Sequence, residues 1–220
     1  MKMNISDNAL LWDSLQETAY SLQKSDLEQG ASVMASAFRD DPAIRYLLGG
    51  ETIGADDWRY FLTVLKAVYG KCVMLSTDET VQDLLILFPP KLKTVPSLRF
   101  LLNGGIGLYR YFGMTLFSRT INYENNCKRI KDPFLTPDTW YCMCFVVLPE
   151  KQGQGTRSRL MKPALQALDK HHIPLYLETH KETNTHIYKH FGFDVVDISA
   201  IPGTGRTQYA MLRPSNAWVK

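Results

Sequence analysis

A glycine-rich turn between residues 147 and 161 has the residue types of a phosphate-binding loop. The apolar run that ends at Leu148 is followed by Gly153 and Gly155, and a helical pattern begins at Thr156. Where a helix begins after such a loop, unpaired backbone N–H groups converge and the helix dipole adds positive potential. The sequence therefore predicts that a ligand with phosphate groups binds at this turn.

A second polar motif lies downstream, where Asn184 and Tyr188 share a short helical pattern that ends at Gly192. This motif and the loop Gln152-Gly-Gln-Gly155-Thr-Arg157 together resemble the two signatures of the GNAT superfamily of acyl-CoA-dependent N-acetyltransferases. One position departs from the pattern, because Arg157 stands where glycine or alanine is typical. An arginine at this helix start is expected to add a charge-assisted contact to the pyrophosphate or the 3′-phosphate of CoA.

The resemblance covers about residues 18 to 214 and is strongest to the branch that contains puromycin N-acetyltransferase. The further segments that carry it are Ala37-Phe-Arg-Asp-Asp-Pro42, Trp140-Tyr141, Val147-x-Pro149, Leu177-Glu-Thr179 and Met211-Leu-Arg-Pro214. It implies an α/β (α+β) fold with a mixed, mostly antiparallel central sheet flanked by helices. Puromycin does not follow as the substrate, because fold and site type constrain the reaction more than the acceptor.

The resemblance also implies acetyl-CoA as cosubstrate, with no metal. The backbone of residues 145–147 is expected to pair with the pantetheine amides as an added strand would. The expected acetyl-CoA-binding residues are Phe145, Val146, Val147, Gln152, Gly153, Gln154, Gly155, Thr156, Arg157, Ser158 and Asn184.

Tyr188 and Glu178 are the candidate catalytic residues. Transfer of an acyl group from a thioester to an amine releases a proton from the amine and produces a thiolate, so the site needs a base and an acid. Tyr188 is expected to be the general acid, since an unperturbed phenol with a pKa of about 10 is protonated at neutral pH; its alternative role is core packing. Glu178 is expected to act as a base or to bind the cationic acceptor. Its alternative is a structural carboxylate that caps the following loop through Thr183 and Asn184.

The histidines near residue 186 and a short basic run are explained without a metal site or another binding site. His186 and His190 have a spacing that suits zinc, with His180 shortly before, but no H-E-x-x-H motif or cysteine cluster accompanies them. Solvated or partly packed histidines are therefore favoured. The basic run of Lys128, Arg129 and Lys131 is expected to lie on a solvated surface.

The elements that position these residues alternate between helix and strand. Apolar periodicity predicts helices at 7–16, 26–41, 58–69, 156–170 and 184–191, with Asp26 as the N-cap of the second and Asp41-Pro42 as its end. Strands are expected at 19–23, 72–75, 81–88, 140–148, 174–178, 193–198 and 207–211. The apolar but less regular residues 94–135 predict an extra helical insert.

Length and composition fit one globular domain. The chain has 220 residues, of which 45% are hydrophobic and 21% charged, enough for a sizeable core. We expect a helical extension at 1–17 and a single acyl-CoA N-acyltransferase domain at 18–214. A formal net charge of +3 is too mild to indicate binding to nucleic acid or a membrane, and the absence of a signal core or long apolar stretch predicts a cytoplasmic protein.

The four cysteines lack the spacing of a redox or zinc motif, which predicts reduced thiols. Cys142 and Cys144 alternate along an expected strand, so both side chains are predicted to point to the same face of the sheet.

These inferences favour an acetyl-CoA-dependent N-acetyltransferase that transfers an acetyl group to a primary amine on a small molecule, by direct attack with Tyr188 as general acid. Two alternatives remain open. One is a non-catalytic acyl-CoA binder or sensor, in which Arg157 marks a degenerate loop. The other is an enzyme that acetylates a protein or peptide.

Overall fold

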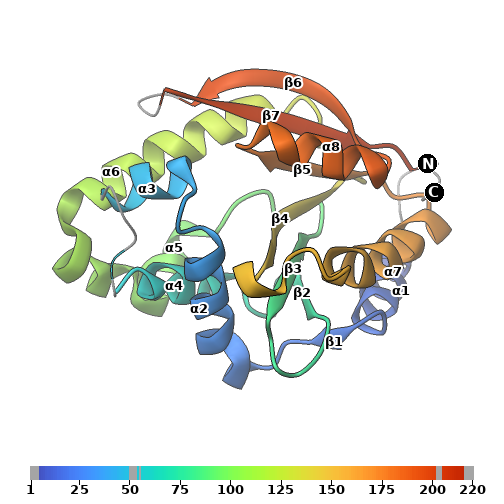
Figure 1. The fold of residues 1–220 in the computed structure, drawn as a ribbon, viewed down its shortest axis with the longest axis horizontal. Coiled ribbons are helices and arrows are strands. Elements are labelled where there is room, and N and C mark those ends of the chain that lie inside the picture. Colours follow the sequence, from blue (N-terminus) through green and yellow to red (C-terminus); the bar gives the residue numbers. More distant parts are fainter. Residues whose placement is uncertain (1–4, 50–53, 55, 202–204, 216–220) are drawn as a thin grey trace.

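A seven-stranded sheet runs through the molecule (Figure 1). The computed structural model describes residues 5–49, 54, 56–201 and 205–215. The strands are β1 Tyr20–Ser21, β2 Val73–Ser76, β3 Asp83–Phe88, β4 Trp140–Val147, β5 Leu175–Thr179, β6 Asp194–Ile201 and β7 Arg206–Arg213. Their order is β1-β2-β3-β4-β5-β7-β6, and each neighbouring pair is antiparallel except β4 and β5. The expected mixed, mostly antiparallel sheet is confirmed.

Helices cover both faces of this sheet (Figure 1). They are α1 Ile5–Gln16, α2 Leu27–Ala37, α3 Pro42–Leu48, α4 Trp58–Val68, α5 Ser97–Phe100, α6 Ile106–Lys131, α7 Thr156–Lys170 and α8 Glu182–His190, with short turns η1 Lys24–Asp26, η2 Leu101–Gly105 and η3 Pro149–Lys151. Every helix and strand expected from the sequence is present, with shifted ends. Strong hydrophobic periodicity is the reason, because each element must bury one apolar face or stripe.

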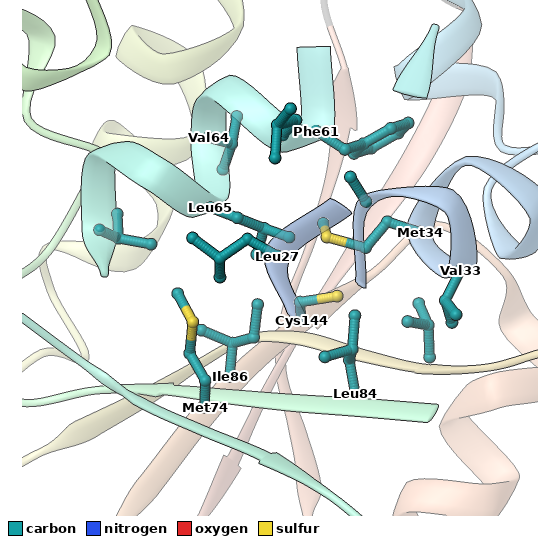
Figure 2. Close-up of a cluster of buried hydrophobic side chains, with 14 of the residues drawn as sticks. Leu27, Val33, Met34, Phe61, Val64, Leu65, Met74, Leu84, Ile86 and Cys144 are labelled. Carbon is teal, nitrogen blue, oxygen red and sulfur yellow. The ribbon is translucent and has the colours of Figure 1, made fainter. Parts of the chain in front are cut away.

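One face of the sheet packs beneath α2 and α4 (Figure 2). Leu84 and Ile86 of β3 and Cys144 of β4 point from the sheet toward these two helices. The helices contribute Leu27, Val33 and Met34 from α2 and Phe61, Val64 and Leu65 from α4. All of these side chains are buried, so this face forms one continuous hydrophobic core.

The opposite face packs beneath α7 and α1. Leu11 and Leu15 of α1 are fully buried in the same cluster as Leu160 and Leu165 of α7. The ring of Trp12 lies 6.4 Å from that of Trp140 on β4, measured between centroids. The first helix therefore contributes to the central core, although it lies outside the segment that resembles the GNAT family.

The parallel pair β4 and β5 separates partway along its length. Their pairing covers Trp140 to Cys142 against Leu175 to Leu177 and stops there, whereas β4 continues along β3 to Val147. The register with β3 shifts by one residue at Met143, since Ile86 pairs with Cys144 and Leu87 with Cys142. A bulge of this kind bends a strand and re-aims its side chains. Because the pairing with β5 stops at Cys142, one backbone edge of residues 143–147 has no strand neighbour in the described parts of the chain.

The bulge corrects the expectation for the two strand cysteines. Cys144 packs in the cluster beneath α2 and α4, and Cys142 packs in the cluster beneath α7 and α1. The extra residue at Met143 reverses the alternation, so the two thiols point to opposite faces. All four cysteines are free and buried, as expected.

Two helix boundaries near the N-terminus differ in detail from the prediction. The expected end of α2 at Asp41-Pro42 is wrong, because α2 ends at Ala37. Asp41-Pro42 instead begins α3, where Asp41 accepts hydrogen bonds from the backbone N–H groups of Ala43 and Ile44 and Pro42 occupies the first helical position. Asp26 occupies the predicted N-cap position of α2, but its side chain makes no cap to the helix and accepts from the backbone N–H of Gln23 at 2.7 Å.

The segment between β3 and β4 is helical, as predicted, and longer than a simple pair of helices. It begins with α5, passes through η2 and continues into α6, and it covers the end of the molecule beside α3 and α4 (Figure 1). No helix within the described ranges is both long and apolar enough to cross a membrane.

Candidate active site

The glycine turn joins β4 to α7 in the predicted strand-loop-helix arrangement. Gly153 and Gly155 have φ values of +78° and +75°, in the left-handed region that favours glycine. A Cβ added at either position would meet no atom within 4 Å, so the space beside the loop is open. The first turn of α7 follows directly, with half-buried Arg157 and Ser158 on it. Backbone N–H groups and a positive helix end therefore face open space.

Side chains of the loop hold its shape. Gln152 donates from Nε2 to the backbone oxygen of Val147 at 3.1 Å, and Gln154 donates to that of Glu150 at 3.1 Å. Thr156 Oγ1 donates to the backbone oxygen of Lys151 at 3.4 Å. These bonds give the three polar side chains a role in loop geometry, which leaves the backbone and Arg157 as the groups directed to a ligand.

A cavity of about 200 Å³ lies in the gap between β4 and β5. Met143, Cys144 and Phe145 line it from β4, and Asn184 and Tyr188 line it from α8. The far wall is formed by apolar and aromatic side chains of α2, α3 and α4: Met34, Phe38, Ile44, Tyr60, Phe61 and Val64. The unpaired edge of β4 and the predicted catalytic residues thus open into one space.

Tyr188 is half-buried at this cavity, and its ring lies 5.8 Å from that of Phe193 in an edge-on arrangement. Burial and the nearby Cys142 raise the pKa of the Tyr188 hydroxyl, while the positive charge of Arg157 lowers it. The net shift is upward, so the hydroxyl stays protonated across the working pH range. Tyr188 therefore packs on the core with its ring and borders the cavity with a protonated hydroxyl.

Glu178 projects from β5 at the point where that strand leaves β4. Its Oε2 accepts from the hydroxyl of Tyr141 at 3.2 Å, and its Oε1 accepts from the hydroxyl of Tyr176 at 3.0 Å. Burial raises the pKa of this carboxyl, whereas the charge of Lys131 and the two tyrosine hydroxyls act in the opposite direction. Thr183 and Asn184 are not among its hydrogen-bond partners in the described residues. Asn184 instead donates to Thr179 Oγ1 at 3.0 Å and holds the β5–α8 loop.

No protein-family model matches the chain. A protein of Schizosaccharomyces pombe, named an uncharacterized N-acetyltransferase, is 36% identical over 55 residues, which are 25% of this chain and 22% of that protein. The match therefore spans less than a quarter of the length of this relative.

Solved structures match over most of the chain. The structure of histone acetyltransferase HPA2 and related acetyltransferase from Corynebacterium glutamicum gives a TM-score of 0.58 at 16% identity, covering 88% of this chain and 93% of that one. A Drosophila melanogaster polyamine N-acetyltransferase gives 0.56 at 13% identity, covering 88% and 97%. Arylalkylamine N-acetyltransferase 2 of Aedes aegypti gives 0.55 at 11% identity, covering 89% and 97%.

The chain has the fold of the GNAT N-acetyltransferases. The predicted resemblance is confirmed for that fold. The puromycin N-acetyltransferase-like branch is not singled out by these comparisons and stays a prediction. Within the GNAT fold of this chain, the separated β4 and β5 strands and Tyr188 line one cavity, and the glycine turn follows the end of β4, with Arg157 in a separate surface groove.

The cavity between β4 and β5 is also lined by polar residues that were not among the site residues predicted from the sequence. Asp41, from the junction of α2 and α3, and His180, from the end of β5, lie within hydrogen-bond distance, with 3.3 Å between Oδ2 and Nδ1. Tyr123 of α6 places its hydroxyl 3.1 Å from Nε2 of the same imidazole. No local signal marks this cluster, because Asp41 and His180 are 139 residues apart.

Two charged residues of α6, Glu124 and Lys131, also line this cavity. Burial raises the pKa of Glu124, and the nearby Lys131 opposes that shift. Lys131 is buried, and its Nζ lies 4.7 Å from the centroid of the Tyr141 ring. The expectation that Lys131 lies on a solvated surface is therefore wrong, although Lys128 and Arg129 are exposed. The reason is that the last turn of α6 packs across the sheet.

The two histidines of α8 are not part of the cluster formed by Asp41, Tyr123 and His180. His186 and His190 are exposed, and His190 Nδ1 is 2.6 Å from the backbone oxygen of His186. Among the described residues, no group of three or more histidine, cysteine, aspartate or glutamate side chains is arranged to hold a metal ion.

Proposed function

We propose that this chain is an acetyl-CoA-dependent N-acetyltransferase that acetylates a primary amine on a small molecule. The observation that carries the proposal is the joining of two features in one cavity. The unpaired edge of β4 runs beside the glycine turn, and the same cavity is lined by Tyr188, Asn184 and Glu178. The GNAT fold of the chain agrees with this arrangement.

The glycine turn suits the pyrophosphate of CoA, and the free edge of β4 suits its pantetheine arm. Backbone N–H groups at the start of α7 and the guanidinium of Arg157 fit a pyrophosphate. Arg157, Lys162 and Lys189 also line a surface groove beside the loop, which gives the phosphates a positive surrounding. The free backbone edge of residues 143–147 fits the pantetheine amides, which would add to β4 like a further strand. Tyr188 borders that path from the α8 side.

The residues suit acetyl transfer by direct attack. The amine nitrogen forms a bond to the thioester carbon, the carbon–sulfur bond breaks, and the departing thiolate receives a proton. Tyr188 is the proposed donor of that proton. Because its pKa is raised, we expect its hydroxyl to stabilise the developing thiolate by a hydrogen bond and to transfer the proton as the bond breaks.

The far wall of the cavity suits an amine with an apolar or aromatic body. The rings of Phe38 and Phe61 stack with centroids 5.8 Å apart beside the cavity, and Glu178 offers a negative charge to an ammonium group. The confined volume of about 200 Å³ favours a small acceptor over a folded protein segment. Structural relatives described as polyamine and arylalkylamine N-acetyltransferases also act on amines.

Two measurements test this function. Acetyl-CoA at one hundred times its dissociation constant is expected to stabilise the fold by about 2.7 kcal/mol, seen as a rise in melting temperature. Thiol release from acetyl-CoA is then measured with a panel of arylalkylamines, diamines, aminonucleosides and peptides, and fastest release is expected with a small amine. Stabilisation without thiol release would support a binder or sensor, fastest release with peptides would support a peptide acetyltransferase, and no stabilisation would contradict all three.

A further inference from the structure

His180 and Asp41 form a buried acid–imidazole pair inside the cavity. Asp41 Oδ2 lies 3.3 Å from His180 Nδ1, and the two side chains are only 12% and 13% exposed. Burial acts to raise the pKa of Asp41, but hydrogen bonds from His180 and from the backbone of Ile44 and Ala43 outweigh it, and the pKa is lowered. Asp41 is therefore an ionised carboxylate that faces the ring.

The position of Asp41 is fixed by the backbone. Its Oδ1 accepts from the N–H groups of Ala43 at 2.9 Å and Ile44 at 3.1 Å, which begin α3. One carboxylate oxygen thus caps a helix, while the other is directed at the imidazole. A carboxylate anchored in this way restricts the ring to one orientation and stabilises a positive charge on it.

The bond to Asp41 decides which ring nitrogen carries the proton. Because an ionised carboxylate only accepts hydrogen bonds, Nδ1 of the neutral ring is protonated and Nε2 has the lone pair. The hydroxyl of Tyr123, 3.1 Å away, then donates to Nε2. Burial raises the pKa of Tyr123 well above its ordinary value, so this hydroxyl is protonated and able to donate.

Glu178 is a less suitable proton acceptor than this pair. Both of its oxygens already accept hydrogen bonds, from the hydroxyls of Tyr141 and Tyr176. Those bonds favour its ionised form and oppose the upward shift that burial gives its pKa, and they occupy both oxygens. Glu178 is thereby suited to attract an ammonium group, which still leaves the proton of the attacking amine to be removed.

We propose that His180, oriented by Asp41, is the base that receives the proton of the acceptor amine through the hydroxyl of Tyr123. This assignment rests on the proposed acetyltransferase function. The acceptor binds as an ammonium ion and passes one proton to the Tyr123 oxygen, while the Tyr123 proton passes to His180 Nε2. The imidazolium that forms is paired with Asp41, and the neutral amine nitrogen then attacks the thioester carbon. The carbon–sulfur bond breaks and the thiolate receives the Tyr188 proton. The nitrogen loses its second proton through solvent to the tyrosinate of Tyr188, and His180 releases its proton to solvent.

Several other titratable or charged groups share the cavity with His180. They are Asp41 from the α2–α3 junction, Tyr60 from α4, Tyr123, Glu124 and Lys131 from α6, Tyr141, Cys142 and Cys144 from β4, Glu178 from β5 and Tyr188 from α8. Of these, Asp41 and Tyr123 contact the imidazole directly. Their individual removal is therefore the sharpest test.

The test is the pH profile of kcat/KM for His180→Gln with the best amine of the panel. Without its base, the variant depends on amine that is already deprotonated in solution. Its activity is expected to fall about a hundredfold at pH 7 and to approach that of the wild type as the pH rises through the pKa of the alkylamine, about 10.4, where the neutral form becomes the major one. His186→Gln, which changes an exposed histidine on α8 that lines neither the cavity nor the groove beside the loop, is the control and should match the wild type throughout.

Two further variants separate the proton path from structural support. Asp41→Asn keeps an oxygen to cap α3 but removes the charge, and Tyr123→Phe removes only the relaying hydroxyl. Both should show the same recovery at alkaline pH, with acetyl-CoA affinity unchanged. An active wild type with a His180→Gln variant that loses activity equally at all pH values, or loses none, would overturn the relay alone. A wild type inactive with every amine would overturn the proposed function, and the relay with it.

Discussion

At the scale of single residues, the ring and the hydroxyl of Tyr188 are expected to have separate roles. Its ring packs edge-on against Phe193, and its hydroxyl borders the cavity beside β4. We expect Tyr188→Phe to reduce kcat by about a hundredfold, because the departing thiolate loses its proton donor. The ring packing is retained, so the affinity for acetyl-CoA should be unchanged. Steady-state kinetics and calorimetric titration measure the two quantities.

Tyr109→Phe is a suitable control for that variant. Tyr109 lies on α6 with 57% of its surface exposed, so the loss of its hydroxyl should change neither kcat nor cofactor affinity. If Tyr188→Phe turned over as fast as this control, Tyr188 would have no part in the mechanism.

Glu178 links the chemistry of the site to the stability of the fold. Since its folded pKa is raised above the ordinary 4.5 by burial, the native state holds the proton more tightly than the unfolded state. Its contribution to stability is then fully present below pH 4.5 and is lost as the pH rises through the folded pKa. Glu178→Gln should therefore be more stable than the wild type at pH 7.5, and this advantage should shrink at pH 4.5.

Urea unfolding at the two pH values measures this difference. Glu28→Gln, which changes an exposed carboxylate on α2, should show no such pH dependence. An advantage for Glu178→Gln that grew toward acid pH would contradict the upward shift, and would mean that the two tyrosine hydroxyls outweigh burial.

The site residues differ in how far the sequence predicted them. Tyr188, Glu178 and the glycine turn lie in local motifs, so their types and spacing were readable along the chain. The pairing of His180 with Asp41 and Tyr123 depends on how α3 and α6 pack over the sheet. Hydrophobic periodicity indicates that a helix packs, but does not fix which polar side chains converge above it.

At the scale of elements, boundaries follow from local backbone chemistry. Asp41-Pro42 begins α3 after α2 has ended at Ala37, and the residue types agree with this start because aspartate caps helices and proline suits their first position. The bulge at Met143 has no comparable signal, since it arises from the pairing of β4 with β3. The free backbone edge of residues 145–147 was expected from the resemblance, whereas the bulge beside it was beyond prediction from the residues alone.

Gly113 allows a prediction about α6. It has φ +66° and ψ −172° within this helix, a conformation that costs other residues about 2 kcal/mol, so Gly113→Ala should destabilise the fold by about that amount. Gly107, in the same helix, has open space around its Cα and no left-handed φ. Gly107→Ala should instead stabilise by about 0.5 kcal/mol, because alanine is the better helix former. Chemical denaturation measures both; equal effects would contradict the distortion at Gly113.

At the scale of the whole molecule, Arg213 ties three elements together. This fully buried side chain donates from Nε to the backbone oxygen of Phe191 at 2.8 Å and forms a two-bonded ion pair with Asp169, of which the Nη2–Oδ2 bond is 2.7 Å. It thereby joins the end of β7 to the ends of α7 and α8, the two helices that flank the proposed CoA path.

Arg213→Ala is expected to destabilise the fold by about 3 kcal/mol, because it leaves a partly buried carboxylate and a backbone oxygen without their partner. Arg45→Ala removes an exposed ion pair with Asp40 and should change stability by less than about 1 kcal/mol. Equal losses in the two variants, measured by urea unfolding, would show that Arg213 does not hold these elements together.

Acetyl transfer to an amine is the claim on which the other proposals depend. The most direct measurement incubates the wild type with acetyl-CoA labelled with ¹³C in the acetyl group and with the amine panel, and identifies products by mass spectrometry. We predict one labelled N-acetyl amine for each molecule of free CoA released, at a rate that Tyr188→Phe reduces. Tight binding of acetyl-CoA with no labelled amine from any small or peptide acceptor would contradict this function.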